Sequence, residues 1–206
     1  MKNLDSLFQE HSDAEGGRFA KLLSEFIVDK GIKIIVETGS GISSLFILKA
    51  IEGTHSKLYS IDPSPWCNFQ VDGGDNYEHI NKRSVDAMDK LFIKTGEWGL
   101  FLHDGNHDIL CQTYEYEFAY RCLKMGGYLA SDDINWGNNR AWSNFIYKYK
   151  LTPFKIGAID VVQKTHEIYL NKHDAKRVSS EILSEAKDIE TKWLAAGNKN
   201  TGIFIY

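Results

Sequence analysis

The chain has 206 residues, 43% of them hydrophobic and 25% charged, which is typical of a globular protein with enough apolar material for a sizeable core. A net charge of −4 argues against a nucleic acid or an anionic membrane as partner, and no run of about 18 apolar residues predicts a membrane span. Three cysteines without CxxC spacing favour neither a disulfide framework nor structural zinc, and no secretory signal stands out, so we expect a cytoplasmic protein.

Helical and strand-like patterns alternate along the first half of the chain. Apolar residues at helical spacing predict a helix over 18–29, within an N-terminal helical segment (1–30) whose residues 11–19 are a candidate lid. The predicted elements that follow are a strand over 33–36, a helix over 42–52, a strand over 57–62, a weaker strand within 77–86, a helix over 86–94 and a strand over 98–104.

The second half continues in the same way. A helix over 109–125 is expected to end at Gly126 and Gly127, because glycine suits a helix C-terminus. After it we predict a strand over 128–133, a helix over 138–149, strands over 154–162 and 167–171, a helix over 174–195 and a strand over 201–206.

This alternation predicts an α/β fold of the Rossmann-like, doubly wound type, with helices on both faces of a mostly parallel sheet. We expect that sheet to be seven-stranded, with seven of the eight predicted strands. No linker interrupts it, so residues 1–206 are expected to form a single domain. Ligands of such sheets bind beyond the carboxyl ends of the strands. Four predicted strands end in acids, which indicates a site on that rim: Glu37, Asp62, Asp104 and the pair Asp132–Asp133.

A glycine turn, V-E-T-G-S-G-I-S-S (36–44), joins the first of these strands to a helix. Gly39 and Gly41 permit a tight turn and the close approach of a ligand to the backbone. The turn lacks the lysine of a Walker loop, and Ser44 stands at the third glycine of a dinucleotide fingerprint. A dinucleotide, another nucleotide and a turn without ligand all stay open on the glycines alone.

Glu37, two residues before Gly39, favours one of these ligands. Its carboxylate would repel a pyrophosphate and attract an α-ammonium group. S-adenosylmethionine carries an amino-acid moiety and no phosphate, and Asp62 at the next strand end suits its ribose hydroxyls. We favour this cofactor, and keep as alternatives an NAD-type Rossmann oxidoreductase and a non-catalytic cofactor-binding protein.

The remaining acids suggest chemistry. Asp104, Asp132 and Asp133 end strands that would be neighbours, and carboxylates that close need a cation to stay ionised. An all-oxygen cluster suits Mg²⁺ or another hard divalent cation. His107, three residues after Asp104, could take the proton of a substrate hydroxyl.

The motif E-T-G-S-G, followed by I-D at the next strand end, resembles the class I S-adenosylmethionine-dependent methyltransferases. When the binding positions of this family are matched to the sequence, the resemblance implies that the methionine part of the cofactor lies at the glycine turn. It places the ribose at the end of the second strand and the adenine after the third strand. The residues implied are Glu37, Gly39, Gly41 and Ser43 for the turn, Asp62 for the ribose, and Ser84, Val85 or Asp86 for the adenine.

D-x-x-H after a strand, then L-K-x-G-G and an acidic pair, resembles the metal-dependent O-methyltransferases, above all the macrolide-sugar and cephalosporin-hydroxylase-like types. The resemblance covers residues 33 to about 136. It implies Asp104, Asp132 and Asp133 as Mg²⁺ ligands and His107 as catalytic base, with Asp104 also part of the catalytic centre. Asp132 departs from the glutamate frequent in the sugar enzymes, and Asp133 from the asparagine of catechol-type enzymes.

Aromatic and amide side chains follow the acidic pair. Trp136, in the predicted loop, is a candidate for the substrate pocket, whereas Trp142 and Tyr147 are assigned mainly to packing. Such a lining suits a sugar or a substituted aromatic ring. The sequence therefore predicts an O-methyltransferase for a hydroxyl of a small sugar-containing or aromatic natural product, and leaves open whether the chain forms a homo-oligomer.

Overall fold

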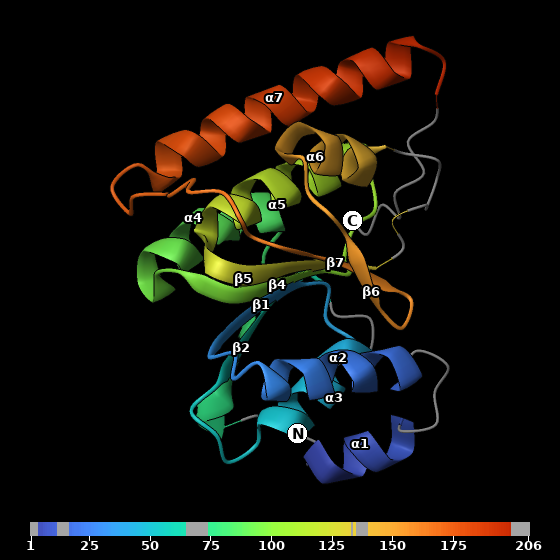
Figure 1. Cartoon of the computed structure of the whole chain (residues 1–206), viewed down its shortest axis with the longest axis vertical. Helices are drawn as coiled ribbons and strands as arrows, with labels where there is room; N and C mark the ends of the chain where they lie inside the picture. Colours follow the sequence, from blue (N-terminus) through green and yellow to red (C-terminus); the bar gives the residue numbers. More distant parts are fainter. Residues whose placement is uncertain (1–3, 12–16, 65–73, 133, 135–139, 199–206) are drawn as a thin grey trace.

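The computed structural model describes residues 4–11, 17–64, 74–132, 134 and 140–198 (Figure 1). Its helices are α1 (Leu4–His11), α2 (Gly17–Asp29), α3 (Ile42–Ile51), α4 (Ser84–Thr95), α5 (Ile109–Cys122), α6 (Ala141–Tyr149) and α7 (Ala175–Ala195), with a short 3₁₀ turn at Gly74–Asn76. Its strands are β1 (Ile34–Thr38), β2 (Lys57–Ile61), β3 (Tyr77–Ile80), β4 (Trp98–His103), β5 (Leu123–Ser131), β6 (Phe154–Ile156) and β7 (Ile159–Gln163).

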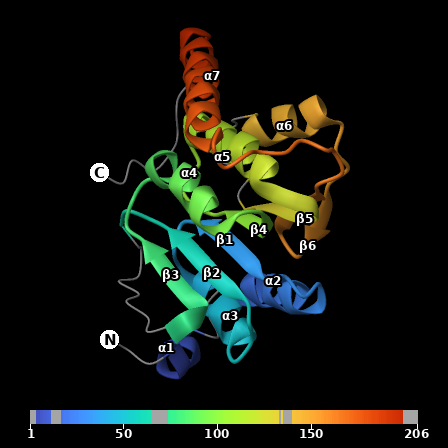
Figure 2. The same cartoon turned by 90° about the vertical axis from the view of Figure 1, so that its left-hand side faces the viewer.

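The strands form one seven-stranded sheet in the order β3-β2-β1-β4-β5-β7-β6. Every pair from β3 to β5 is parallel, and β7 runs antiparallel to both β5 and β6. Figure 2 shows the parallel strands side by side and twisted. The predicted Rossmann-like, doubly wound sheet is confirmed.

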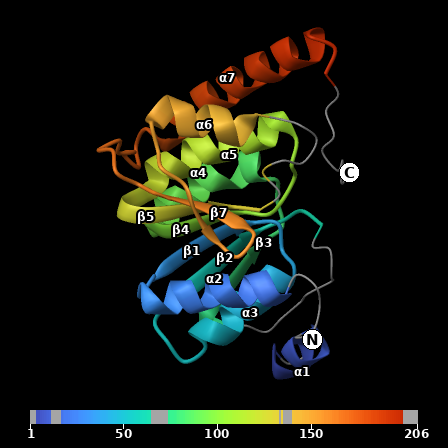
Figure 3. The same ribbon diagram turned by 45° about the vertical axis from the view of Figure 1, so that its right-hand side comes forward.

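Helices cover both faces of this sheet. α1, α2 and α3 lie on one face, and α4, α5 and α6 on the other, where α7 packs across α4 and α5 as an outer layer (Figures 1 and 3). Alternate residues of a strand point to opposite faces. Ile35 and Leu100 accordingly join the core under α2 and α3, whereas Val36 and Phe101 join the core under α4 and α5. Burial on both faces explains why these strands are apolar throughout.

The predicted elements up to residue 104 are confirmed with small shifts of their ends. The weak third strand occupies only Tyr77–Ile80, and the helix after it begins at Ser84. The helix expected over 174–195 is confirmed as α7. Most of the candidate lid (residues 12–16) and the strand expected over 201–206 lie outside the described residues.

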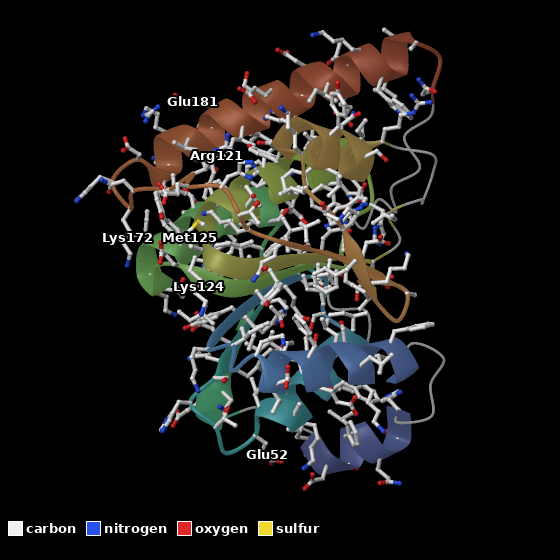
Figure 4. All side chains as sticks on the ribbon, in the orientation of Figure 1. Glu52, Arg121, Lys124, Met125, Lys172 and Glu181 are labelled. Carbon is white, nitrogen blue, oxygen red and sulfur yellow. The ribbon has the colours of Figure 1, made fainter. Side chains whose placement is uncertain are left out.

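The helix expected over 109–125 is shorter than predicted. It ends at Cys122, and Gly126 and Gly127 belong to β5 instead of closing the helix. β5 is irregular there, since its register with β4 shifts between Trp98 and Leu100. A side chain at Gly127 would meet the carbonyl oxygens of Lys124, Gly99 and Trp98 at 2.9–3.2 Å. The glycines therefore permit the irregular beginning of β5, where the side chains of Lys124 and Met125 are exposed (Figure 4).

The strand predicted over 167–171 is wrong, because that segment forms no strand. Its alternating Ile168 and Leu170 pack against the core under α4 and α5 without a ladder partner. The buried ammonium group of Lys164 fixes the segment by donating to the carbonyls of Leu123 and Ile168, both at 2.6 Å. The alternation thus reflects packing and not pairing.

The two aromatic residues assigned to packing in α6 behave differently. Trp142 is buried, whereas Tyr147 is 86% exposed, so the assignment of Tyr147 is wrong. Trp142, Phe145 and Tyr149 share the buried face of α6, and Tyr147 falls on the opposite side of the helix. Among the described residues, no helix is both long and apolar enough to cross a membrane.

Candidate functional site

The ends of four strands lie side by side at one rim of the sheet. Thr38 at the end of β1 is in register with Ile61 of β2 and with His103 of β4, and His103 is in register with Ser131 of β5. Glu37 is the penultimate residue of β1, and an acid follows each of the other three strands directly: Asp62, Asp104 and Asp132. Four acids of the predicted rim, Glu37, Asp62, Asp104 and Asp132, therefore lie at the ends of neighbouring strands.

The two glycines of the turn have different roles. Gly39 has a φ of +82°, and a Cβ there would lie 2.1 Å from the carbonyl oxygen of Asp104, so the backbones of the two strand ends touch. Gly41 caps α3 with a φ of −161°, and a Cβ there would meet no described atom within 4 Å. Gly39 is needed for packing, whereas no described residue fills the space beside Gly41.

We expect Gly39→Ala to destabilise the protein by about 2–5 kcal/mol, from the left-handed backbone and the clash with Asp104 together. The matched change Gly41→Ala should cost no more than about 1 kcal/mol, the usual effect of a poorer helix cap. Urea unfolding of both variants measures the difference. Equal losses would contradict the separate roles of the two glycines.

Glu37 lies fully buried beneath this turn. One carboxylate oxygen, Oε1, accepts hydrogen bonds from the hydroxyls of Ser44 and Ser60, and the other, Oε2, has no partner among the described residues. Burial raises the pKa of Glu37 to about 8, against the lowering effect of the two serine hydroxyls. In the absence of a ligand this side chain is therefore mostly protonated at neutral pH, and one of its oxygens faces no donor.

The sequence did not reveal the partners of Glu37. The sequence marks Ser44 only as the residue at the third glycine of a dinucleotide fingerprint, and Ser60 only as part of a predicted strand. In the fold, Ser44 lies in the first turn of α3 and also accepts the N–H of Gly41 at 3.1 Å. Both serines are polar residues within apolar stretches, which is the one signal that the sequence offers. That Ser60 contacts Glu37 follows from the pairing of β1 with β2, in which these two residues are in register.

Asp62 holds the backbone around the turn. Its carboxylate accepts the N–H of Ser40 at 2.9 Å and that of Ser64 at 2.8 Å. These bonds fix the carboxylate at the end of β2, next to the glycine turn, and each of its oxygens keeps a lone pair for another donor.

Ser43 connects the turn to the acids of the rim. Its hydroxyl donates to Oδ2 of Asp104 at 3.1 Å. Asp104 is half-buried, and its N–H continues the β1–β4 ladder to Thr38. Asp132 is half-buried too, and its N–H donates to the carbonyl of His103. Asp104 and Asp132 thus follow adjacent strands at the same level of the sheet.

The third acid of the predicted metal site, Asp133, lies outside the described residues, as does Trp136. Within the part of the chain that the structure describes, no three histidine, cysteine or acidic side chains are grouped closely enough to hold a metal ion. The assignment of a metal to Asp104, Asp132 and Asp133 therefore stays a prediction.

His107 is buried beside the end of β4, with 7% of its surface exposed. Its Nδ1 lies 3.3 Å from Nε2 of His103 and 3.4 Å from Nε2 of Gln112. Burial, with a smaller contribution from His103, lowers the pKa of His107 to about 3. The imidazole is therefore neutral throughout the physiological range and keeps one nitrogen lone pair.

Ser84 and Val85 occupy the first turn of α4, after β3. Ser84 is buried, and Val85 packs against the core under α4 and α5. The end of β3 adjoins that of β2, because the N–H of Asp62 donates to the carbonyl of Ile80. These two residues therefore follow the strand next to Asp62, where the resemblance expects the adenine.

The comparisons with known proteins agree with this fold and rim. Residues 36–134 match the family model described as a methyltransferase domain. The matched stretch, just under half of the chain, contains the glycine turn and the strand ends of the rim, and it agrees with the class I methyltransferase fold that the sequence resembles. No curated protein matches the sequence.

Solved structures share the fold at low sequence identity. An O-methyltransferase from Bacillus cereus in complex with SAH is 14% identical, with a TM-score of 0.58 over 78% of this chain and 90% of that one. MycE methyltransferase from the mycinamycin pathway, in complex with Mg, SAH and mycinamycin VI, is 12% identical, with a TM-score of 0.59 over 78% of this chain and 54% of that one. The N-methyltransferase NodS from Bradyrhizobium japonicum is 14% identical, with a TM-score of 0.52 over 74% of this chain and 97% of that one. Since O- and N-methyltransferases both appear, the fold does not decide the acceptor atom.

Proposed function

We propose that the protein is an S-adenosylmethionine-dependent O-methyltransferase that acts on a hydroxyl of a small sugar-containing or aromatic molecule, assisted by a divalent cation. The observation that carries the proposal is Oε2 of Glu37, a buried carboxylate oxygen without a described partner. A cationic donor at this position would satisfy it and stabilise the ionised carboxylate.

The α-ammonium group of S-adenosylmethionine is such a donor. The open space beside Gly41, at the N-terminus of α3, gives the amino-acid part of the cofactor room next to Glu37. Asp62, already fixed by two backbone N–H groups, has lone pairs left for ribose hydroxyls. The SAH held by the B. cereus and MycE proteins agrees with this choice.

An NAD-type oxidoreductase is disfavoured by the same carboxylate. A pyrophosphate over the turn would lie close to the Asp62 carboxylate and would oppose the ionisation of the buried Glu37, whereas an ammonium group would favour that ionisation. No cation from the described residues donates to either acid. The turn is thus electrostatically suited to an ammonium and not to a phosphate.

In the proposed reaction the acceptor oxygen attacks the methyl carbon of the sulfonium. The carbon–sulfur bond breaks as the carbon–oxygen bond forms, which leaves S-adenosylhomocysteine and a methyl ether. The hydroxyl proton passes to a ring nitrogen of His107, which is neutral and able to accept it. Correct placement of the hydroxyl and its deprotonation supply most of the rate enhancement.

The low pKa of His107 limits its strength as a base. A proton passes to such an imidazole only from a hydroxyl that has itself become more acidic. A divalent cation, bound by Asp104, Asp132 and Asp133, would supply the charge that makes a coordinated hydroxyl acidic. Three carboxylates offer the oxygen donors that Mg²⁺ prefers, and the MycE structure holds Mg.

Transfer of a labelled methyl group from S-adenosylmethionine to a panel of hydroxylated sugars and phenols tests the proposal. We expect transfer to at least one hydroxyl, its loss with EDTA and its recovery with Mg²⁺. Asp104→Asn should lower turnover about a hundredfold or more, because one metal ligand loses its charge. Transfer that is indifferent to EDTA and to Asp104→Asn would contradict the role of the cation, and transfer to amines alone would contradict the hydroxyl acceptor.

Gly41→Ala tests the cofactor position separately. A methyl group in the space beside the turn should weaken the binding of S-adenosylhomocysteine at least tenfold while the protein stays folded. Calorimetric titration of the variant measures this. Unchanged affinity would mean that the cofactor does not approach Gly41.

A further inference from the structure

A chain of hydrogen bonds runs beneath the rim, from the glycine turn to His107. The hydroxyl of Thr38 donates to Oε2 of Glu115 at 2.6 Å, and the same oxygen lies 2.6 Å from Nδ1 of His103. Nε2 of His103 lies 3.3 Å from Nδ1 of His107, and the two rings meet edge to face at 90°. Thr38, Glu115 and His103 are each at most 2% exposed.

These groups are costly to bury. Replacing a buried carboxylate and imidazole by apolar side chains of similar volume is often neutral or stabilising. Glu115 belongs to α5, which packs between the sheet and α7. The backbone of Thr38 is paired with β2 and β4, so its side-chain hydroxyl is not needed to hold it in the sheet. Stability alone therefore does not explain why these polar groups are buried. Their connection to His107 suggests a functional reason.

The contacts restrict where the ring protons lie. A carboxylate only accepts, so Nδ1 of His103 carries the proton that it donates to Glu115. A neutral His103 then has a lone pair on Nε2, and the hydrogen bond to His107 needs the proton on Nδ1 of His107. That tautomer leaves the lone pair of His107 on Nε2. In the opposite arrangement His103 would be a buried cation and Nε2 of His107 would carry a proton.

Gln112 is consistent with the first arrangement. Its amide nitrogen lies 3.4 Å from Nδ1 of His107, while its oxygen is buried without a described partner. The two ends of an amide are assigned from the network around them. With the amide rotated by half a turn, its oxygen would face Nδ1 of His107 and share that N–H with Nε2 of His103.

We propose that Glu115 is a positioning residue for the reaction: through His103 it holds the proton of His107 on Nδ1, so that Nε2 is the atom that takes the proton of the substrate. The proposal rests on the proposed function, in which His107 is the base. It also connects the two halves of the site, because Thr38, next to Glu37 in β1, helps to fix Glu115. When His107 becomes protonated, the Glu115 carboxylate stabilises the new charge through the intervening ring.

Nitrogen-15 NMR of the histidine rings tests the tautomer in the cofactor-free wild-type protein. We expect His107 to carry its proton on Nδ1, with Nε2 showing the shift of an unprotonated nitrogen. A proton on Nε2 of His107 would overturn the proposal. This result is independent of any methyl transfer, so it distinguishes a failure of this inference from a failure of the proposed function.

Two substitutions at position 115 separate positioning from packing. Glu115→Met fills the space without an acceptor, so His103 should move its proton to Nε2 and His107 should switch to the Nε2–H tautomer, with kcat roughly a hundredfold lower at unchanged cofactor affinity. Glu115→Gln keeps an oxygen acceptor and should restore the wild-type tautomer and much of kcat. If both variants kept the wild-type tautomer, Glu115 would have no positioning role.

Glu117→Gln is the matched control on the same helix. Glu117 is a buried acid as well, but it accepts hydrogen bonds from Arg121, Lys148 and Tyr149, away from the histidines. Its substitution should lower stability and leave the His107 tautomer and kcat unchanged. A tautomer switch in this control would show that any lost buried acid has the effect, and would contradict a specific role of Glu115.

Discussion

Glu37→Gln is expected to stabilise the cofactor-free protein and to weaken the binding of S-adenosylhomocysteine. Burial raises the pKa of Glu37 from 4.5 to about 8. The folded chain therefore retains a proton that the unfolded chain releases above about pH 4.5. Stability falls as the pH rises from there to about 8, because the unfolded state binds fewer protons over this range.

Glutamine cannot ionise, and its oxygen can still accept hydrogen bonds from the hydroxyls of Ser44 and Ser60. The substitution therefore removes the fall in stability between about pH 4.5 and 8. The variant should match the wild type near pH 4 and exceed it by about 3 kcal/mol near pH 7. Urea unfolding of both proteins across this range measures the difference. A variant that is less stable at neutral pH, or a difference that does not change with pH, would show that Glu37 is not held protonated by its burial.

The predicted effect of Glu37→Gln on cofactor binding can be controlled by comparing two ligands. Loss of the charged contact should weaken S-adenosylhomocysteine about tenfold to a hundredfold. Methylthioadenosine, which lacks the amino-acid part, should bind the wild type and the variant equally. In the wild type, affinity for S-adenosylhomocysteine should rise with pH up to about 8, with release of a proton, as binding ionises Glu37. An equal loss for both ligands would place the amino-acid part away from Glu37.

His107→Ala is expected to lower kcat by roughly a hundredfold to ten-thousandfold, because the hydroxyl proton loses its acceptor. The affinity for S-adenosylhomocysteine should stay the same, since Nδ1 of His107 contacts His103 and Gln112, which lie outside the glycine turn. Single-turnover methyl transfer and calorimetry measure the two quantities separately.

His173→Ala is the control for this substitution. His173 is exposed next to the start of α7, so its loss should change neither turnover nor affinity. If His107→Ala turned over as fast as this control, another group would have to take the proton.

The rim of the site could be predicted because its signals are local. Apolar runs that stop at an acid predicted four strand ends, and the register of Thr38, Ile61, His103 and Ser131 brings these ends together. The glycine turn before α3 was recognisable for the same reason, since Gly39 and Gly41 lie within three residues.

What the sequence could not supply depends on tertiary contacts. In the sequence, two glycines that end a helix look the same as two glycines at the irregular start of a strand. Only the pairing with β4 assigns Gly126 and Gly127 to β5. Glu115 gave no signal either. α5 lies between the sheet and α7 and is buried on nearly every side, so a functional acid on it is not distinguished by hydrophobic periodicity.

Direct calorimetry on the wild-type protein tests whether the glycine turn binds a methyl donor through its amino-acid part. S-adenosylmethionine and S-adenosylhomocysteine should bind with one-to-one stoichiometry, and NAD should not bind, with or without Mg²⁺. Binding of NAD in the absence of any binding of S-adenosylmethionine would contradict the assignment of the glycine turn to a methyl donor.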